Sequence, residues 1–171
     1  MRTSKKIVLL TLFFPFFVSA QSATFQDSLP EHFRGKWLLE GTIGGKETTH
    51  DVVAEWVLGH QYMQFRERSR EKNAHGDAAY EALVFIGWDT PSNQYACLWL
   101  DVTGGGGLSA QAIGHAKRTG DTIAFVFKGS DGSLFHTTFV YERRSDIWRW
   151  LMDDESSGKL EPFARVSLTR K

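Results

Sequence analysis

The chain has 171 residues, with 20 Lys and Arg against 20 Asp and Glu, and a single Cys. This length suits one domain, and the charge balance argues against a polybasic nucleic-acid binder and against an acidic disordered chain. One Cys excludes an intramolecular disulfide framework and a cysteine-rich zinc site, while 13% aromatic residues can supply a packed core.

Residues 1–20 have the features of a cleaved signal peptide. Arg2, Lys5 and Lys6 precede an apolar run over residues 7–18, and small residues follow at Val18-Ser19-Ala20. A membrane anchor is the alternative, but a helix over this run reaches only about 18 Å against a hydrocarbon core of about 30 Å. We therefore predict cleavage near Ala20 and an exported product, periplasmic or secreted, without a membrane span.

Residues 21–34 are interpreted as a polar leader, after which apolar and polar residues alternate with period two. In the clearest segment Tyr80, Ala82, Val84, Ile86 and Trp88 share one face. Gly, Asp, Asn and Ser bound the segments, as expected for strands joined by turns. The predicted strands cover residues 35–43, 50–58, 61–68, 80–88, 94–101, 111–117, 122–128, 134–143, 147–152 and 162–169.

About ten strands at this spacing predict an all-β fold, an antiparallel up-and-down barrel of eight to ten strands over residues 35–171. Closure is favoured because it removes the exposed edges of a sheet this large. A β-sandwich is the alternative. Residues 69–79 are polar and predict a long loop or a single helical turn.

Short aromatic motifs relate the chain to known barrels. Gly-Lys-Trp at residues 35–37 opens the first strand as in lipocalin-type calycin barrels, and Phe-Ile-Gly-Trp-Asp at 85–89 and Leu-Trp-Leu-Asp at 98–101 follow. In this order the motifs resemble a family of exported bacterial domains with a calycin-like barrel, over about residues 33–170. The resemblance implies the barrel fold and assigns no catalytic residue.

In calycin-like barrels the first tryptophan closes one end, and a basic residue of the last strand stacks on it. The resemblance therefore implies a barrel-end cap formed by Trp37 and Arg170, with Arg165 as the other candidate. Nitrobindin-like barrels hold haem through a histidine near the last strand, but residues 161–171 contain no His. We accordingly predict no cofactor.

The six histidines, at positions 32, 50, 60, 75, 115 and 136, show no metal-ligand spacing, and we predict no metal site. Alternation can point His50, His115 and His136 into the barrel. Ser109, His115 and Asp101 lack the Gly-x-Ser-x-Gly turn of a hydrolase, so no catalytic residue is predicted.

Two polar segments lie at predicted strand ends. Asp101 precedes four glycines at residues 104–107, which predict a rim loop containing Asp101, Gly104 and Gly105, because glycine allows positive φ and close backbone approach. The alternative is a flexible hairpin end in which the Asp101 side chain holds the turn. Asp153-Asp154-Glu155 is interpreted as a solvated turn.

A barrel of this strand number can enclose one small ligand. The residues predicted to line such a pocket are Trp56, Phe65, Trp88, Trp99, His115, Tyr141 and Trp150. We therefore predict a protein that binds a small, mostly apolar molecule, without catalysis and without a nucleic-acid partner. The alternatives are an enzyme or haem protein acting inside the barrel, and a structural or interaction module with a filled core. The sequence leaves the oligomeric state open.

Overall fold

A computed structural model describes residues 27–104 and 107–171. The predicted signal peptide and Gly105 of the rim loop lie outside these residues. Within them, two short 3₁₀ helices, η1 (Leu29–Phe33) and η2 (Ala110–Ala112), accompany ten strands. The strands are β1 (Gly35–Ile43), β2 (Lys46–Val57), β3 (Tyr62–Ser69), β4 (Glu81–Asp89), β5 (Gln94–Asp101), β6 (Ile113–Thr119), β7 (Thr122–Lys128), β8 (Leu134–Glu142), β9 (Ile147–Ser156) and β10 (Lys159–Arg170).

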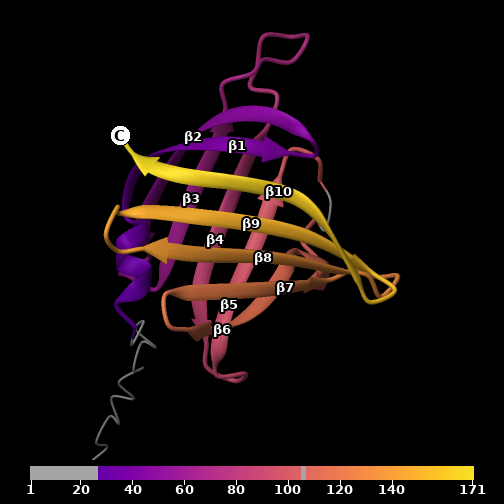
Figure 1. Ribbon diagram of the computed structural model, residues 1–171. Helices are drawn as coiled ribbons and strands as arrows, with labels where there is room; N and C mark the ends of the chain where they lie inside the picture. Colours follow the sequence, from indigo (N-terminus) through magenta and orange to yellow (C-terminus); the bar gives the residue numbers. More distant parts are fainter. Residues whose placement is uncertain (1–26, 105–106) are drawn as a thin grey trace, which may run out of the picture.

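The strands form one closed antiparallel barrel. Each strand pairs with its neighbours in sequence, and β1 pairs with β10 to close the sheet. In Figure 1, β8, β9 and β10 cross the front of the barrel, and β3, β4 and β5 run behind them at a steep angle. The predicted all-β up-and-down barrel is confirmed, and the β-sandwich alternative is not the fold.

The interior of the barrel is packed with large side chains. Along β7, Ile123, Phe125 and Phe127 are buried, while Ala124 and Val126 face solvent, which is the alternation that a barrel wall requires. Other strands add bulky side chains to the same core. The largest fully buried ones include Trp37, Trp148, Trp150, Tyr95, Phe33, Phe125 and Phe139.

One end of the barrel is closed by η1, and we call it the closed end. The helix begins with Pro30 near its N-terminus and buries Leu29 and Phe33 completely. The Phe33 ring stacks on Trp148 with 3.7 Å between ring centroids. Residues 29–33 were interpreted as part of a polar leader. The structure instead buries Leu29, Pro30 and Phe33 in the core and leaves Glu31 exposed, and one helical turn is too short for a periodic signal.

The opposite end, which we call the mouth, carries the β1–β2, β3–β4, β5–β6, β7–β8 and β9–β10 connections. At this end β9 extends to Ser156, so Asp153-Asp154-Glu155 belongs to a strand and not to a turn. The strand is favoured because Asp153 pairs with Arg165 and the Glu155 carboxylate lies 2.6 Å from His136 Nε2. The β3–β4 connection, predicted as a loop or one helical turn, contains one isolated bridge and no helix among its residues.

Candidate functional site

The interior of the barrel becomes polar near the mouth. Along β2 the inward positions are His50, Val52 and Ala54, and along β3 they end with Glu67 and Ser69. His50 Nδ1 lies 2.5 Å from Glu67 Oε1, and the two side chains are only 5% and 3% exposed. A buried, hydrogen-bonded His–Glu pair thus lies on an inner wall that is mostly apolar.

A second set of contacts extends this pair toward solvent. The Thr48 hydroxyl lies 2.8 Å from His50 Nε2 and 3.3 Å from Glu71 Oε2, and the backbone N–H of Thr49 donates to Glu71 Oε1 at 3.1 Å. Hydrogen bonds from its own backbone N–H, and then from Thr49 and Thr48, lower the pKa of the Glu71 carboxyl. Glu71 therefore fastens the β3–β4 loop to the start of β2.

Tyr80 continues the chain of contacts on the other side. Its ring stacks on His50 with 5.7 Å between centroids, and its hydroxyl donates to Asp101 Oδ2 at 3.3 Å. The Trp99 indole N–H lies 3.2 Å from both the Tyr80 hydroxyl and Asp101 Oδ2. Burial, and then the negative charges of Glu67 and Asp101, raise the pKa of Tyr80, so its phenol remains neutral.

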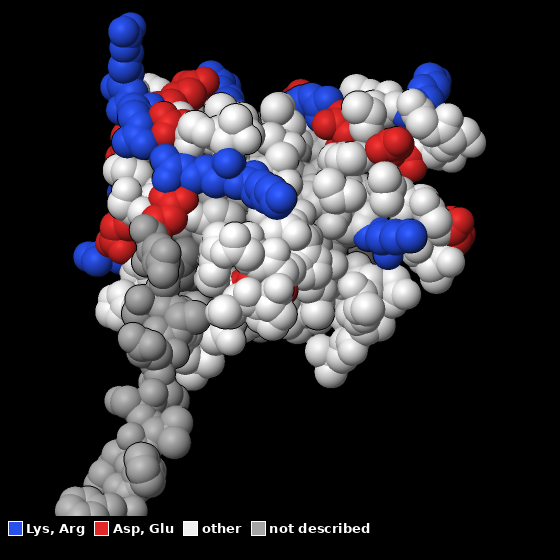
Figure 2. All heavy atoms as spheres, turned by 90° about the horizontal axis from the view of Figure 1, so that it is seen from below, with Lys and Arg blue, Asp and Glu red and all other residues white. Residues whose placement is uncertain are grey.

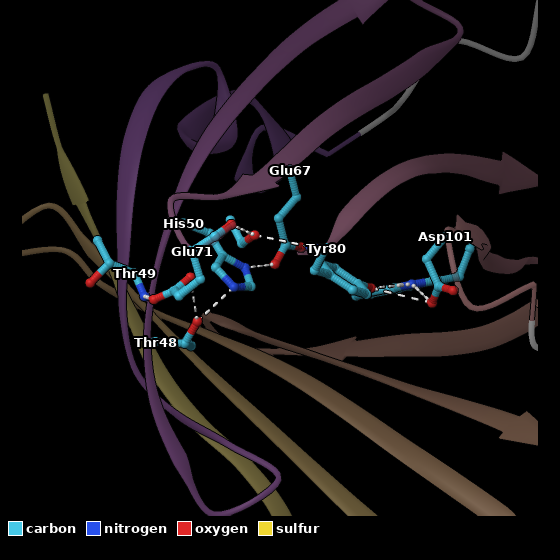
Figure 3. A network of polar contacts seen from close by, with 9 residues as sticks. Thr48, Thr49, His50, Glu67, Glu71, Tyr80 and Asp101 are labelled. Carbon is cyan, nitrogen blue, oxygen red and sulfur yellow. Dashed lines mark hydrogen bonds and ion pairs between the residues drawn. The ribbon is translucent and has the colours of Figure 1, made fainter. Parts of the chain in front are cut away.

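We call these seven residues the mouth network: Thr48, His50, Glu67, Glu71, Tyr80, Trp99 and Asp101. In Figure 3, dashed lines join Thr48 to His50 and His50 to Glu67, and Tyr80 and Asp101 continue the row of polar side chains beside them. The mouth network contains three carboxyl groups and one imidazole, so hydrogen-bond acceptors outnumber basic groups in it. Such a site favours a group that donates hydrogen bonds.

Aromatic side chains lie directly beside this network. The Trp99 and Trp150 rings are 5.4 Å apart, and Trp150 donates its indole N–H to Thr137 Oγ1 at 2.8 Å. Thr137 is completely buried, and Phe135 packs against the core from the same strand. Hydrogen-bonding groups and large apolar surfaces therefore meet at one place, which is the usual composition of a small-molecule site.

The predicted pocket residues do not form one group. Trp56, Trp88 and Tyr141 lie at the closed end, where Trp56 donates to Glu31, Trp88 packs edge-on to Tyr95, and Tyr141 stacks on His32. Phe65 and Trp150 lie in the packed core between the two ends, in contact with Phe33 and Phe139 respectively. Of the predicted set, Trp99 belongs to the mouth network.

His115 lies outside the barrel. Its neighbours Gly114 and Ala116 point inward, while the His115 side chain is 45% exposed and lies 3.9 Å from Asp89. The inward orientation considered from alternation is therefore wrong for His115, because the inward positions of β6 are small residues. His136 faces outward from β8 as well, since its neighbour Thr137 is the buried residue.

Both carboxylate oxygens of the predicted rim residue Asp101 are used. Its Oδ1 accepts hydrogen bonds from the backbone N–H and the hydroxyl of Thr103, at 2.8 and 2.5 Å, while Oδ2 joins the mouth network. Gly104 follows at a φ of +68°. Asp101 therefore holds the turn through its side chain and also connects the β5–β6 loop to the barrel interior.

The predicted cap residues are in contact at the closed end. The Arg170 guanidinium carbon lies 4.1 Å from the centroid of the Trp37 ring, and the two residues face each other in the β1–β10 register. Trp37 donates its indole N–H to the Phe33 carbonyl at 2.6 Å. Arg170 also donates to the Arg34 carbonyl at 2.7 Å and pairs with Asp146.

Sequence reasoning overlooked Glu67, Glu71 and Tyr80 as site residues. Alternation could have identified Glu67, because it follows Met63 and Phe65 at the next inward position of the same segment. Cys97, 0% exposed, is a core residue, and burial raises the pKa of its thiol. A thiol of this kind is a poor nucleophile.

A groove of about 370 Å³ lies between the β7–β8 and β9–β10 turns. Its walls are formed by Asp131, Gly132, Ser133 and Leu134 on one side and residues 155–158 on the other. This groove therefore also lies at the mouth, but aromatic side chains do not contribute to its lining, and a mostly apolar ligand is better matched by the residues around Trp99. In the described parts of the chain, no cluster of three or more His, Cys, Asp or Glu residues is placed to hold a metal ion.

No family model matches the sequence, and the search of curated proteins gives no match either. Of the helices in the described residues, none has the length and apolar character needed to cross a membrane.

Proposed function

We propose that this protein is exported and binds a small, mostly apolar molecule carrying one hydrogen-bond-donating group, at the mouth of the barrel and without covalent chemistry. The observation that carries this proposal is the mouth network, in which buried polar side chains lie beside the aromatic pair Trp99 and Trp150. The likeness of the barrel to lipocalin-type calycins supports the same ligand class, because such barrels can hold one small ligand.

The buried pair of His50 and Glu67 supports a functional role for this region. Burying hydrogen-bonding groups is costly, and replacing both partners of a buried pair with apolar residues of similar volume often leaves a protein equally stable or more stable. Most other inward positions of β2 and β3 are apolar, including Val52, Ala54 and Phe65, and the polar ones lie toward the mouth. A departure from the local pattern at one end of the barrel is expected where function requires it.

Binding at the mouth involves the β3–β4 loop. This loop is fastened by Glu71, whose contacts to Thr48 and Thr49 come from one exposed side chain. We infer that a ligand reaches His50 and Glu67, which are at most 5% exposed, by displacing Glu71, because η1 covers the other end of the barrel. The donor group of the ligand then takes the place of the Thr48 hydroxyl at Glu71, or binds Glu67 directly.

Titration with N-phenyl-1-naphthylamine, an apolar molecule with one N–H donor, tests the proposal by its fluorescence. We expect saturable binding that Trp99→Leu weakens at least tenfold and that Tyr80→Phe weakens by a smaller factor. Trp56→Leu is the matched control, because Trp56 is also partly buried but lies at the closed end. Equal loss of binding in the control, or no effect of Trp99→Leu, contradicts binding at the mouth.

One observation favours an enzyme as a second candidate. Thr48 Oγ1, His50 and Glu67 follow one another at 2.8 and 2.5 Å, which is the order of nucleophile, base and orienting carboxylate in acyl-transfer enzymes. Thr48 Oγ1 would attack an ester carbonyl, His50 Nε2 would take its proton and pass it to the departing alkoxide, and water would then release the acyl group.

Hydrolysis of p-nitrophenyl acetate distinguishes this candidate from simple binding. If Thr48 is the nucleophile, Thr48→Val and His50→Gln each lower the rate at least about 100-fold, the contribution of a positioned base. Thr49→Val is the control, since Thr49 contributes only its backbone N–H to Glu71. A rate that is the same in Thr48→Val and in the unchanged protein excludes the enzyme.

A further inference from the structure

Glu67 is almost fully buried, but only one of its two carboxyl oxygens makes a hydrogen bond. Its side chain is 3% exposed, and Oε1 lies 2.5 Å from His50 Nδ1. Within residues 27–104 and 107–171, the other oxygen, Oε2, accepts no hydrogen bond from a side chain or from the backbone. In the same residues, every fully buried polar side-chain atom has a hydrogen-bond partner. Glu67 Oε2 is therefore not fully enclosed, and it borders a space that a water-sized group can enter.

A second carboxyl group belongs to the same row of the inner wall. Glu67 of β3 is opposite Ala82 of β4, and Ala82 is opposite Asp101 of β5. With strands about 4.8 Å apart, the Cα atoms of Glu67 and Asp101 lie about 10 Å from each other, and Ala82 contributes only a methyl group between them. In Figure 3 the Tyr80 ring lies between His50 and Asp101. Glu67 and Asp101 both act on this phenol, since burial and then their negative charges raise the pKa of Tyr80.

The carboxyl groups of the mouth network have no Lys or Arg partner. Within the described residues, Glu67, Glu71 and Asp101 form no ion pair with either kind of side chain, and the network contains one imidazole for the three groups. On the outer wall, by contrast, Asp51 is paired with Arg70. Figure 2 likewise shows Lys and Arg side chains interspersed with Asp and Glu side chains around the edge of the molecule. Because a nearby opposite charge stabilises a carboxylate, a ligand with a positive charge would supply what the network lacks.

An organic ammonium group suits this region better than a metal ion does. In the parts of the chain that the structure describes, no three His, Cys, Asp or Glu side chains converge as metal ligands do. An ammonium group carries up to three N–H donors and can bind a single carboxylate. The Trp99 indole lies beside Tyr80 and Asp101, and a cation within about 6 Å of an aromatic face is attracted to it. Trp150, 5.4 Å from Trp99, extends the aromatic surface for the apolar part of the ligand.

We infer that the mouth selects apolar amines in their protonated form, with the ammonium group bound to Glu67 Oε2 and the apolar part against Trp99. This inference rests on the proposed function, because it names the ligand class of the same site. Glu67 is then the residue that determines specificity, and the charge of Asp101 adds to its effect. A neutral molecule of the same shape fills the aromatic part of the site but leaves the carboxylates without a cation. An anion of that shape is repelled by them.

Three naphthalene compounds that differ in one group test the inference: 1-naphthylmethylamine, 1-naphthalenemethanol and 1-naphthoic acid. At pH 7 the amine is a cation, the alcohol is a neutral hydrogen-bond donor and the acid is an anion. Isothermal titration calorimetry measures the affinity of the protein for each compound. We expect the amine to bind at least tenfold more tightly than the alcohol, and the acid to bind at least tenfold more weakly than the alcohol. Glu67→Gln should remove most of the advantage of the amine and change the affinity for the alcohol less than threefold.

Glu155→Gln is the matched control for the variant. Glu155 also lies beside a histidine, 2.6 Å from His136 Nε2, but this pair is on the outer side of the barrel. Far-UV circular dichroism establishes that each variant retains the barrel. The comparison of the three compounds on the unchanged protein needs no variant, so it decides the charge preference even if Glu67→Gln does not fold.

The possible outcomes separate this inference from the proposed function. Equal affinities for the amine and the alcohol overturn the inference and leave binding at the mouth intact. A preference for the amine that Glu67→Gln leaves unchanged, or that Glu155→Gln reduces equally, also overturns it. If none of the three compounds binds saturably and N-phenyl-1-naphthylamine does not bind either, the proposed function fails and the inference fails with it.

Discussion

Replacing the buried His50–Glu67 pair separates its role in stability from its role in function. Either His50→Leu or Glu67→Met alone leaves one polar group without its partner in a site where both side chains are at most 5% exposed. Leaving one buried polar group without its partner costs about 1–3 kcal/mol. The double variant His50→Leu/Glu67→Met removes both polar groups, and its stability should equal or exceed that of the unchanged protein.

Urea unfolding followed by far-UV circular dichroism measures these differences, and probe titration on the same proteins measures binding. We expect the double variant to be stable and to bind N-phenyl-1-naphthylamine more weakly. The exposed pair of Arg66 and Glu55 is the control, since breaking it should cost at most about 1 kcal/mol. If the double variant loses as much stability as the two single variants together, the pair stabilises the fold, and the argument for a functional role fails.

Three further perturbations address the closed end, the β1–β10 seam and the chain terminus. In a double-mutant cycle monitored by urea unfolding, Trp37→Ala and Arg170→Ala should couple by about 1 kcal/mol, and additivity within about 0.3 kcal/mol would contradict the stacking. Gly41→Ala should lower Tm more than Gly45→Ala, because a Cβ at Gly41 would lie 2.2 Å from the Arg165 carbonyl oxygen, whereas a Cβ at Gly45 would meet open space. Equal shifts in Tm would contradict this close approach at Gly41. Hydrogen bonds from Arg70 and then Lys171 lower the pKa of Asp51 to about 2. The ionised Asp51 therefore adds to the free energy of unfolding above about pH 4, and this stabilisation is lost as the pH falls toward 2. In Asp51→Asn, the free energy of unfolding measured from pH 6 to 2 should therefore fall less steeply below pH 4 than in the unchanged protein. An equally steep fall in both proteins would contradict this role of Asp51.

Much of the fold could be predicted because alternation and turn residues act locally. The bounds of β1, β5 and β7 agree with the sequence segments, because each segment ends at a turn residue: Gly44 follows β1, Asp101 ends β5 and Gly129 follows β7. The η1 helix could not be found in this way. Its buried residues, Leu29, Pro30 and Phe33, fall within a single turn, and their burial depends on a barrel end that forms only from distant strands.

The site was predictable only in part, because periodicity reports the face of a strand and not the position of a residue along the barrel. Trp99 and Asp101 were singled out separately, as a pocket residue and a rim residue, and the structure joins them through one hydrogen bond. Trp56 and Trp88 were grouped with Trp99 although they lie at the closed end. Strand tilt and stagger determine such neighbours, and neither can be read from alternation.

The two ends of the barrel are held by different kinds of contact, and this difference indicates where motion should occur. At the closed end, Trp37 and Trp148 donate their indole N–H groups to the carbonyls of Phe33 and His32, and Arg170 donates to that of Arg34. These bonds fix the backbone of η1 against buried aromatic rings.

The loop at the mouth is tied to β2 mainly by exposed side chains, those of Glu71 and Arg70, and by one backbone hydrogen bond from Arg70 to Thr49. Opening this loop exposes little apolar surface, whereas displacing η1 would expose Leu29 and Phe33. Amide hydrogen exchange should therefore be faster in the β3–β4 loop than in η1, and ligand access is expected beside His50 and Tyr80. Slower exchange in the loop than in η1 would place the flexible end of the barrel at η1 instead.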